Sequence, residues 1–263
     1  MIEVQGLTKA FGIVTVVRDV SFAVAPGKLL VLVGGSGSGK TTTLKMLNRL
    51  IEPSSGTVHI EGQDARTLPG PLLRRRIGYV FQKVGLFPHL TVAENIEFAL
   101  RVRRMRARER RERRKELLRL VALEGLDDRL PTQLSGGQQQ RIAVARALAH
   151  KPEVLLLDEP FAGLDEPTRD VLLPDVGAIL RHDRVTTFLV THDRGEAQAL
   201  ADRVAVLMAG RIVQLDATAR VFQSPVSEEV ARFVGVETLV SGRVIGRDDG
   251  VTVVEAAGRK LEV

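Results

Sequence analysis

The chain has 263 residues, enough for one large or two small domains with a sizeable core, and no cysteine, which excludes disulfides and cysteine-based metal sites. Its net charge of +6 is local, because residues 101–119 carry eleven basic and three acidic side chains and leave a net −2 for the remainder. No apolar run approaches the roughly 20 residues of a membrane-spanning helix, so a role at a membrane requires another chain to span it.

The N-terminal part of the chain alternates apolar and polar residues. Over residues 1–25 this period of two predicts short antiparallel strands. The opening Met-Ile-Glu-Val-Gln has no basic and apolar leader, so we expect no secretion signal. Phe11 lies between the expected strands. It is either a core aromatic residue, which the sequence alone favours, or a ring that stacks on a base.

Residues 34–42 are the centre of the sequence. They read Gly-Gly-Ser-Gly-Ser-Gly-Lys-Thr-Thr and fit the phosphate-binding pattern G-x-x-x-x-G-K-[ST]. An apolar run at 28–33 predicts a buried strand before the motif, and the apolar spacing over 42–50 predicts a helix after it. Glycines let backbone N–H groups converge on a phosphate, while Lys40 adds a full charge and Thr41 a hydroxyl for Mg2+. The motif in this setting predicts nucleotide binding.

The next elements are a strand at 57–60, a short helix at 72–76 and a buried strand at 77–81. The last of these ends on Gln82, at the sheet edge where open α/β folds bind ligands, although most loop glutamines are only solvated. Residues 92–130 are rich in helix formers and arginine. This composition predicts a mostly helical subdomain inserted in the α/β core.

A second glycine-lined helix start follows. Residues 134–138 read Leu-Ser-Gly-Gly-Gln, and apolar residues continue at helical spacing to Ala149. Ser135 suits an N-cap, and the two glycines allow a ligand close to the backbone. From the residues alone, an anion site and an ordinary helix start are equally supported.

Two further core strands end in polar residues. The strand at 153–157 ends in Asp158 and Glu159, of which the first suits the Mg2+ shell and the second suits a base for an attacking water. The strand at 185–190 leads to His192. A single histidine there is more often structural than catalytic. Because every long core strand ends in a polar group, we expect these groups to converge.

The rest of the chain predicts short elements. A strand pair is expected at 203–208 and 211–215, followed by two helices at 217–223 and 227–233. Two final strands are expected at 238–244 and 251–255, separated by a turn at 248–250. The final 28 residues are too few for a core of their own, so we expect them to pack on the main domain or on a partner.

In order and spacing, these motifs resemble those of the nucleotide-binding subunits of ATP-binding cassette (ABC) transporters of the prokaryotic importer type, and residues 134–138 match the family's signature. The resemblance covers residues 1 to about 235, the expected ATPase domain. It implies an α/β P-loop core with an antiparallel β subdomain, a helical subdomain inserted at about 90–150, and a short β segment at 236–263. That last segment resembles a truncated, oligomer-binding-like regulatory domain.

The resemblance implies a role for each motif residue. Glu159 is the expected catalytic base, with Gln82 and His192 beside the attacking water and the γ-phosphate. Mg2+ is expected on Thr41, Gln82 and Asp158. The residues implied to contact ATP are Phe11, Val16, Gly34, Gly35, Ser36, Gly37, Ser38, Gly39, Lys40, Thr41, Thr42, Ser135, Gly136, Gly137, Gln138 and Asp165. No catalytic position departs from the family, so we expect an active ATPase.

The resemblance also implies partners. Each ATP would be held between the phosphate loop of one subunit and the signature of the other, in a head-to-tail homodimer. Asp165 would face the other subunit across the dimer interface. Membrane permease subunits and, indirectly, a solute-binding protein complete the expected complex on the cytoplasmic face of the cell membrane. The alternative is a soluble ABC ATPase acting on nucleic acid. It is disfavoured by the single cassette and the short insert, so no nucleic acid is expected.

Two questions stay open. Residues 41–56 and 77–96 resemble ATPases that import glycine betaine, choline and similar quaternary amines, whereas residues 231–244 resemble those for tungstate, molybdate and related oxyanions. The length of the tail favours the oxyanion. The arginine-rich segment 101–119 is either a solvated helical face with Glu–Arg pairs or a surface near anionic lipids, worth roughly 1 kcal/mol per well-placed arginine.

Overall fold

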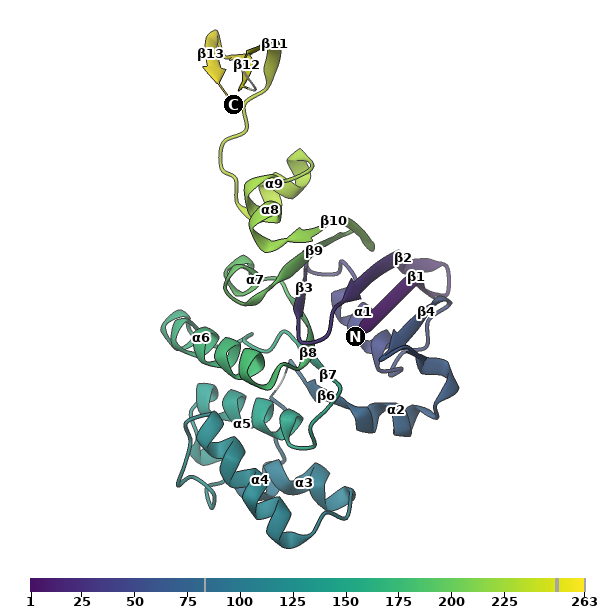
Figure 1. Cartoon of the computed structure of the whole chain (residues 1–263), viewed down its shortest axis with the longest axis vertical. Coiled ribbons are helices and arrows are strands. Elements are labelled where there is room, and N and C mark those ends of the chain that lie inside the picture. Colours follow the sequence, from purple (N-terminus) through teal and green to yellow (C-terminus); the bar gives the residue numbers. More distant parts are fainter. Residues whose placement is uncertain (83, 249–250, 263) are drawn as a thin grey trace.

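The computed structural model describes residues 1–82, 84–248 and 251–262. Figure 1 shows a group of helices at one end of the molecule, sheets in the middle, and a small β unit with the C-terminus at the other end. Among the residues so described, no helix has the length and apolar character needed to cross a bilayer.

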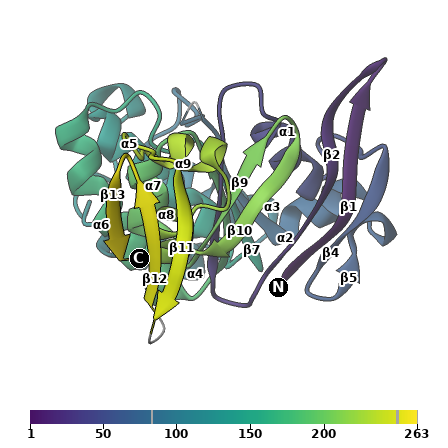
Figure 2. The ribbon, with the colours of Figure 1, turned by 90° about the horizontal axis from the view of Figure 1, so that it is seen from above.

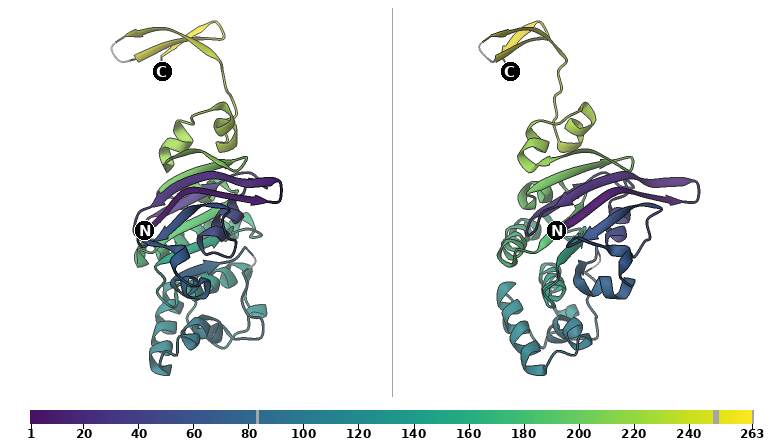
Figure 3. Two further views of the ribbon diagram at one scale, coloured as in Figure 1. Left: turned by 90° about the vertical axis from the view of Figure 1, so that its right-hand side faces the viewer. Right: turned by 45° about the vertical axis from the view of Figure 1, so that its right-hand side comes forward.

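An antiparallel sheet forms the N-terminal part. Its strands are β1 (Ile2–Phe11), β2 (Val14–Val24), β4 (Ser55–Ile60) and β5 (Gln63–Asp64). They lie in the order β2-β1-β4-β5, and β1 pairs with β2 from Ile2–Val24 to Phe11–Val14. The predicted antiparallel pairing is confirmed, but these two strands have 10 and 11 residues and are not short. Figure 3 shows their hairpin projecting beyond the rest of the sheet.

A second sheet of six strands forms the centre of the molecule. Its strands are β3 (Leu29–Val33), β6 (Ile77–Val80), β7 (Val154–Asp158), β8 (Thr186–Thr191), β9 (Arg203–Met208) and β10 (Arg211–Ala217). They lie in the order β10-β9-β3-β8-β7-β6, all parallel except the edge strand β10. Every residue of β3, β7 and β8 is buried, which explains the continuous apolar runs in β3 and β7.

Helices cover both faces of the central sheet and form the far end of the molecule (Figures 1 and 2). They are α1 (Lys40–Leu47), α2 (Gly70–Arg76), α3 (Val92–Val102), α4 (Ala107–Leu120), α5 (Gly136–Leu148), α6 (Glu166–Asp183), α7 (Arg194–Leu200), α8 (Thr218–Gln223) and α9 (Glu228–Val234). The sequence analysis did not predict α6 and α7. Proline at the start of α6 and at Pro174 inside it obscures the helical pattern.

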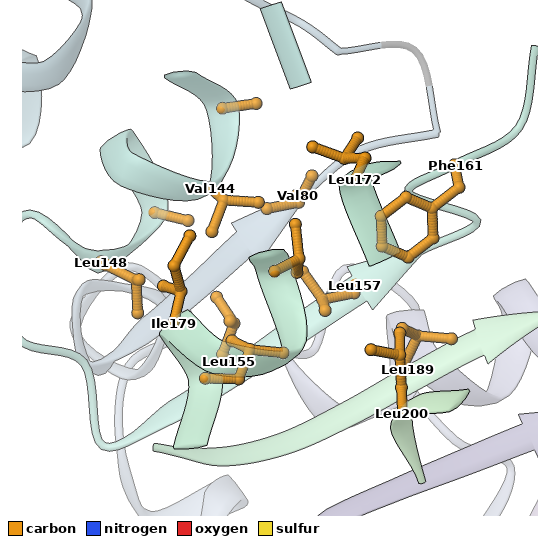
Figure 4. Packing of buried hydrophobic residues seen from close by; sticks show 14 of the residues in the cluster. Val80, Val144, Leu148, Leu155, Leu157, Phe161, Leu172, Ile179, Leu189 and Leu200 are labelled. Carbon is orange, nitrogen blue, oxygen red and sulfur yellow. The ribbon is translucent and has the colours of Figure 1, made fainter. Parts of the chain in front are cut away.

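Two hydrophobic clusters lie on opposite faces of the six-stranded sheet. Leu155 and Leu157 of β7 face α5 and α6, and Figure 4 shows their packing against Val144, Leu172 and neighbouring side chains. The alternate residue Leu156 faces the other way, into a cluster shared with α1 and the antiparallel sheet. Because side chains of β7 pack in both clusters, the end of this strand is fixed by contacts on both faces of the sheet.

The arginine-rich segment is paired within the protein to a large extent. Glu97 of α3 is 3% exposed and receives ion pairs from Arg101, Arg110 and Arg114. Arg113 is also buried and donates to the carbonyls at the end of α5. The predicted Glu–Arg pairs at helical spacing occur as well, for example between Arg108 and Glu112 of α4. Residues 92–130 were predicted to be mostly helical. Helix α4 ends at Leu120, and residues 121–130 form no helix, which differs from that prediction.

The C-terminal strands form a sheet of their own, made of β11 (Gly242–Asp248), β12 (Val251–Ala256) and β13 (Arg259–Glu262). The strand predicted from residue 238 begins only at Gly242, β13 was not predicted, and residues 249–250 of the predicted turn lie outside the described residues. Figures 1 and 3 show this sheet set apart from α8 and α9, joined by an extended segment. Of the two expected positions, packing on the main domain is therefore not observed for the part described.

Candidate functional site

The phosphate-binding motif forms the loop between β3 and α1. Position 34 has no room for a side chain, because a Cβ there would lie 2.4 Å from the Leu207 carbonyl oxygen. Gly39 has a φ of 105°, which favours glycine, and it immediately precedes α1. Lys40 is buried, and its Nζ donates to the carbonyls of Gly34 and Gly35 at 2.9 and 3.0 Å. Burial lowers the pKa of Lys40, although Glu159 and Asp158 act in the opposite direction.

An oxygen-rich corner lies where the loop meets β7. The Thr41 hydroxyl donates to Asp158 Oδ1 at 2.9 Å, and the Tyr79 hydroxyl donates to Oδ2 of the same carboxylate at 3.1 Å. Asp158 is 4% exposed, and Tyr79 comes from the neighbouring strand β6. Burial and the adjacent Asp158 both raise the pKa of Tyr79, so it remains a hydrogen-bond donor at neutral pH.

Glu159 joins the ends of three strands. Its Oε2 accepts a hydrogen bond from Gln82 Nε2 at 3.2 Å and lies 3.2 Å from His192 Nδ1. Its Oε1 lies 3.8 Å from Lys40 Nζ. The backbone of Glu159 has a φ of 44°, an unusual value for a residue other than glycine. The expected convergence of Gln82, Glu159 and His192 is therefore present in the geometry.

A hollow of about 540 Å³ opens over these groups. It is lined by Val16, Ser36, Gly37, Gly39, Lys40, Thr41, Thr42, Gln82, Glu159 and His192. All ten belong to the set expected from the sequence, which marks this hollow as the candidate site. Its main-chain and cationic groups suit an anion with several charges, such as a polyphosphate.

Six expected residues lie elsewhere. Ser135 is the N-cap of α5 and forms a capping box with Gln138, while neither these two nor Gly136 and Gly137 line the hollow. Exposed Asp165 immediately precedes α6. Phe11 is half exposed at the tip of the β1–β2 hairpin, under Lys9, so it is not the core residue that the sequence alone favoured. A single chain thus presents two separate glycine-lined helix N-termini.

Two residues of this region were missed by the sequence analysis. Tyr79 reaches Asp158 from inside a strand, and its only signal was being the one tyrosine of the chain. Arg169 of α6 bonds to Asp193 and to the Leu164 carbonyl, next to His192 and Asp165 respectively. Its helix was not predicted, so no pattern pointed to it.

Comparison with known proteins agrees with this geometry. The ABC transporter family profile matches residues 17–162. The sulfate/thiosulfate import ATP-binding protein CysA of Xanthomonas campestris is 47% identical over 245 residues, covering 92% of this chain and 71% of that protein. The glycine betaine/carnitine/choline transport ATP-binding protein OpuCA of Bacillus subtilis is 44% identical, covering 92% of this chain and 64% of that protein.

The fold is also shared with solved structures. An ATP-binding cassette in a dimeric post-hydrolysis state with ADP and Pi matches with a TM-score of 0.73 and 33% identity, over 83% of this chain and 99% of that one. This match confirms the predicted P-loop α/β fold with antiparallel and helical subdomains. Given a family profile over more than half of the chain and relatives above 40% identity, the chain belongs to the ABC transporter family, as an ATP-binding ATPase subunit of the prokaryotic importer type.

Proposed function

We propose that this chain hydrolyses MgATP in the 540 Å³ hollow and thereby powers the import of an oxyanion. The observation that carries the proposal is the meeting of Lys40, Gln82 and His192 around the Glu159 carboxylate. Phosphoryl transfer needs positioning and charge stabilisation more than covalent chemistry, and this arrangement offers both.

Each group in the hollow has a role in the proposed reaction. Backbone N–H groups of residues 36–42 and the Lys40 ammonium bind the phosphates. The Glu159 carboxylate takes a proton from water as the water oxygen bonds to the γ-phosphorus and the bond to ADP breaks. Gln82 and His192 orient this carboxylate and the water. The Glu159 side chain lines the hollow, and its backbone φ of 44° is of the kind found at functional sites.

The Thr41 and Asp158 oxygens fit a Mg2+ ion. Hard oxygen ligands from one or two side chains, together with substrate phosphates, are the set that Mg2+ favours. The hydroxyl and the carboxylate already lie 2.9 Å apart, and Gln82 lines the same hollow as Thr41 and is the third ligand of the proposed set. When bound, the ion neutralises charge on the β- and γ-phosphates. Tyr79 would hold the second oxygen of Asp158 in place.

The second glycine-lined helix start, at α5, has a role in a proposed dimer. We propose that Ser135, Gly136, Gly137 and Gln138 contact ATP bound to a second copy, in a head-to-tail homodimer that Asp165 faces across. The support is that these residues are apart from the hollow of their own chain, while Ser135 and Asp165 are exposed. Phe11 would stack on the adenine from the hairpin tip.

The domain division follows the same proposal. Residues 1–235 form the ATPase domain, with the helical subdomain at about 90–150 facing membrane permease subunits at the cytoplasmic face of the membrane. Residues 236–263 are a truncated regulatory segment that packs on a partner. The small separate sheet β11–β13 supports this part of the proposal.

The oxyanion is the finer part of the proposal. A sulfate/thiosulfate import protein is 47% identical to the chain, and the tail favours the same class. Quaternary amines are the alternative, since a glycine betaine/carnitine/choline transport protein is 44% identical. The difference of three percentage points is small, so the experiment below separates the two solutes.

The test is a pull-down from native membranes with a Glu159→Gln chain, which should bind ATP and stop before hydrolysis. Co-purification of a permease and a solute-binding protein is the expected result. Binding of sulfate, molybdate or tungstate by that second protein would support the oxyanion. Binding of glycine betaine or choline would replace it with the alternative, and ribosomal or DNA-associated partners without a permease would overturn the transport role.

A further inference from the structure

Arg169 bridges two loops that are far apart in the sequence. Its Nη1 donates to Asp193 Oδ2 at 2.8 Å, and its Nη2 donates to the Leu164 carbonyl at 3.1 Å. Leu164 precedes Asp165, and Asp193 follows His192. The side chain of Arg169 is 28% exposed, so both bonds lie in a partly desolvated setting. One guanidinium therefore holds the loop before α6 and the loop before α7.

The Asp193 end of this bridge is held firmly. Its Oδ1 accepts from the Glu196 backbone N–H at 3.0 Å and caps α7, while its own N–H donates to the Thr191 hydroxyl at 3.0 Å. His192 lies between Thr191 and Asp193, with its ring 3.2 Å from Glu159. A change in the Arg169–Asp193 bond would therefore shift the residue that reaches the Glu159 carboxylate.

The Leu164 end of the bridge lies close to the start of α5 and next to exposed Asp165. A Cβ at Gly136, the first residue of α5, would lie 3.2 Å from Leu164 Cδ2. The Arg169 Nε is buried and has no hydrogen-bond partner within the described parts of the chain. The guanidinium thus has an unused donor and can exchange partners when Leu164 moves.

We propose that Arg169 is a positioning residue that couples the Leu164–Asp165 loop, facing the second subunit, to His192 in the hydrolysis site of its own chain. The inference rests on the proposed head-to-tail dimer and deepens it. Contact with a partner at Asp165 fixes the Leu164 carbonyl, Arg169 transmits this constraint to Asp193, and His192 is thereby held at the position beside Glu159 that it has in the single chain. Hydrolysis in one chain thereby depends on correct docking of the other.

The test compares the full wild-type chain with Arg169→Gln and Arg169→Lys, using kcat and KM for MgATP, the ATP dissociation constant and the melting temperature. Arg76→Gln is the matched control. Arg76 is 27% exposed and also bridges two groups, Glu153 and Gln63, neither of which lines the hollow. Loss of an arginine bridge as such should cost similar stability in both glutamine variants.

The expected result is a kcat lowered roughly 10- to 100-fold in Arg169→Gln, with KM and the dissociation constant within about twofold of wild type. Arg76→Gln should keep its kcat. Arg169→Lys should recover thermal stability through Asp193 but not kcat, because one ammonium does not reproduce the planar two-ended fork. Adding Asp193→Asn to Arg169→Gln should lower kcat no further, since both changes cut the same link.

Wild-type kcat in Arg169→Gln, or full recovery of kcat by Arg169→Lys, would overturn the coupling and leave the proposed function intact. An equal fall of kcat in Arg76→Gln would also overturn it, because the effect would then be one of stability. A wild-type chain that binds but never hydrolyses ATP would overturn the proposed function and the coupling together.

Discussion

The Thr41 hydroxyl and the Asp158 carboxylate lie 2.9 Å apart, although 117 positions separate them in the chain. The bond joins the first turn of α1 to the end of β7. It also makes a sharp test possible, because valine has the shape of threonine without the hydroxyl and serine keeps the hydroxyl.

We predict that Thr41→Val weakens the apparent Mg2+ affinity in ATP hydrolysis by roughly 10- to 100-fold, since an oxygen ligand is lost and Asp158 loses a partner. Thr41→Ser should stay within about twofold. A Mg2+ titration of the ATPase rate measures both. An unchanged titration curve in Thr41→Val would remove Thr41 from the proposed metal site.

The two glycines at the start of the phosphate loop should respond differently to alanine. A Cβ at Gly34 would lie 2.4 Å from the Leu207 carbonyl oxygen, whereas nothing lies within 4 Å of one at Gly35. We predict that Gly34→Ala lowers the free energy of unfolding by roughly 1–3 kcal/mol, through forced backbone movement, and that Gly35→Ala leaves it nearly unchanged. Urea denaturation of the pair checks this, and equal midpoints would contradict it.

Glu97 should be the most sensitive carboxylate of the helical part. Glu97→Gln leaves its arginine partners, among them Arg110 and Arg114, without a full counter-charge. We predict a loss of roughly 2–3 kcal/mol, below the 3–5 kcal/mol of fully buried pairs because the arginines are partly exposed. Glu112→Gln is the control, since its pair with Arg108 is exposed and should be worth under about 1 kcal/mol. Chemical denaturation at low and high salt measures both variants.

Glu196 should make stability depend on pH. Burial is the main cause that raises its pKa to about 7, with Asp193 adding to the effect while Thr191, Arg169 and His192 oppose it. A carboxyl group with a raised pKa in the folded state binds a proton on folding between about pH 4.5 and 7. Its contribution is therefore most favourable below that window and is lost as the pH rises through 7.

We predict that Glu196→Gln removes this component of the pH dependence and stabilises the protein at pH 8, by up to about 3 kcal/mol. Melting temperatures of wild type and variant from pH 5 to 8 test the sign. If the difference in melting temperature between wild type and Glu196→Gln stays constant from pH 5 to 8, Glu196 does not titrate in that range.

The hollow was largely predictable because its parts come from local patterns. A glycine motif between a strand and a helix places Lys40 and Thr41, and buried strands that end in polar residues place Glu159 and His192. Parallel strands bring such ends to one edge, so convergence follows from topology. Phe11 was less predictable, since the reach of a hairpin depends on twist and not on composition.

Bridges between elements were not predictable from single stretches. Arg169 and Tyr79 form side-chain hydrogen bonds to residues 24 and 79 positions away. The local sequence around each of them therefore contains no pattern that predicts its role. The helix that carries Arg169 also has prolines that weaken its pattern. Its helical state is held by packing, as the burial of Leu172 and Ile179 shows.

Tyr79 gives the site a natural optical signal. The chain has one tyrosine and no tryptophan, and that tyrosine donates its hydroxyl to the Asp158 carboxylate. Its ultraviolet emission is therefore free of energy transfer to an indole, and a carboxylate acceptor at the phenol is a local quencher. Any event that redirects Asp158, such as ion or nucleotide binding, will change the emission of the unlabelled protein, which lets occupancy be timed in a stopped-flow instrument.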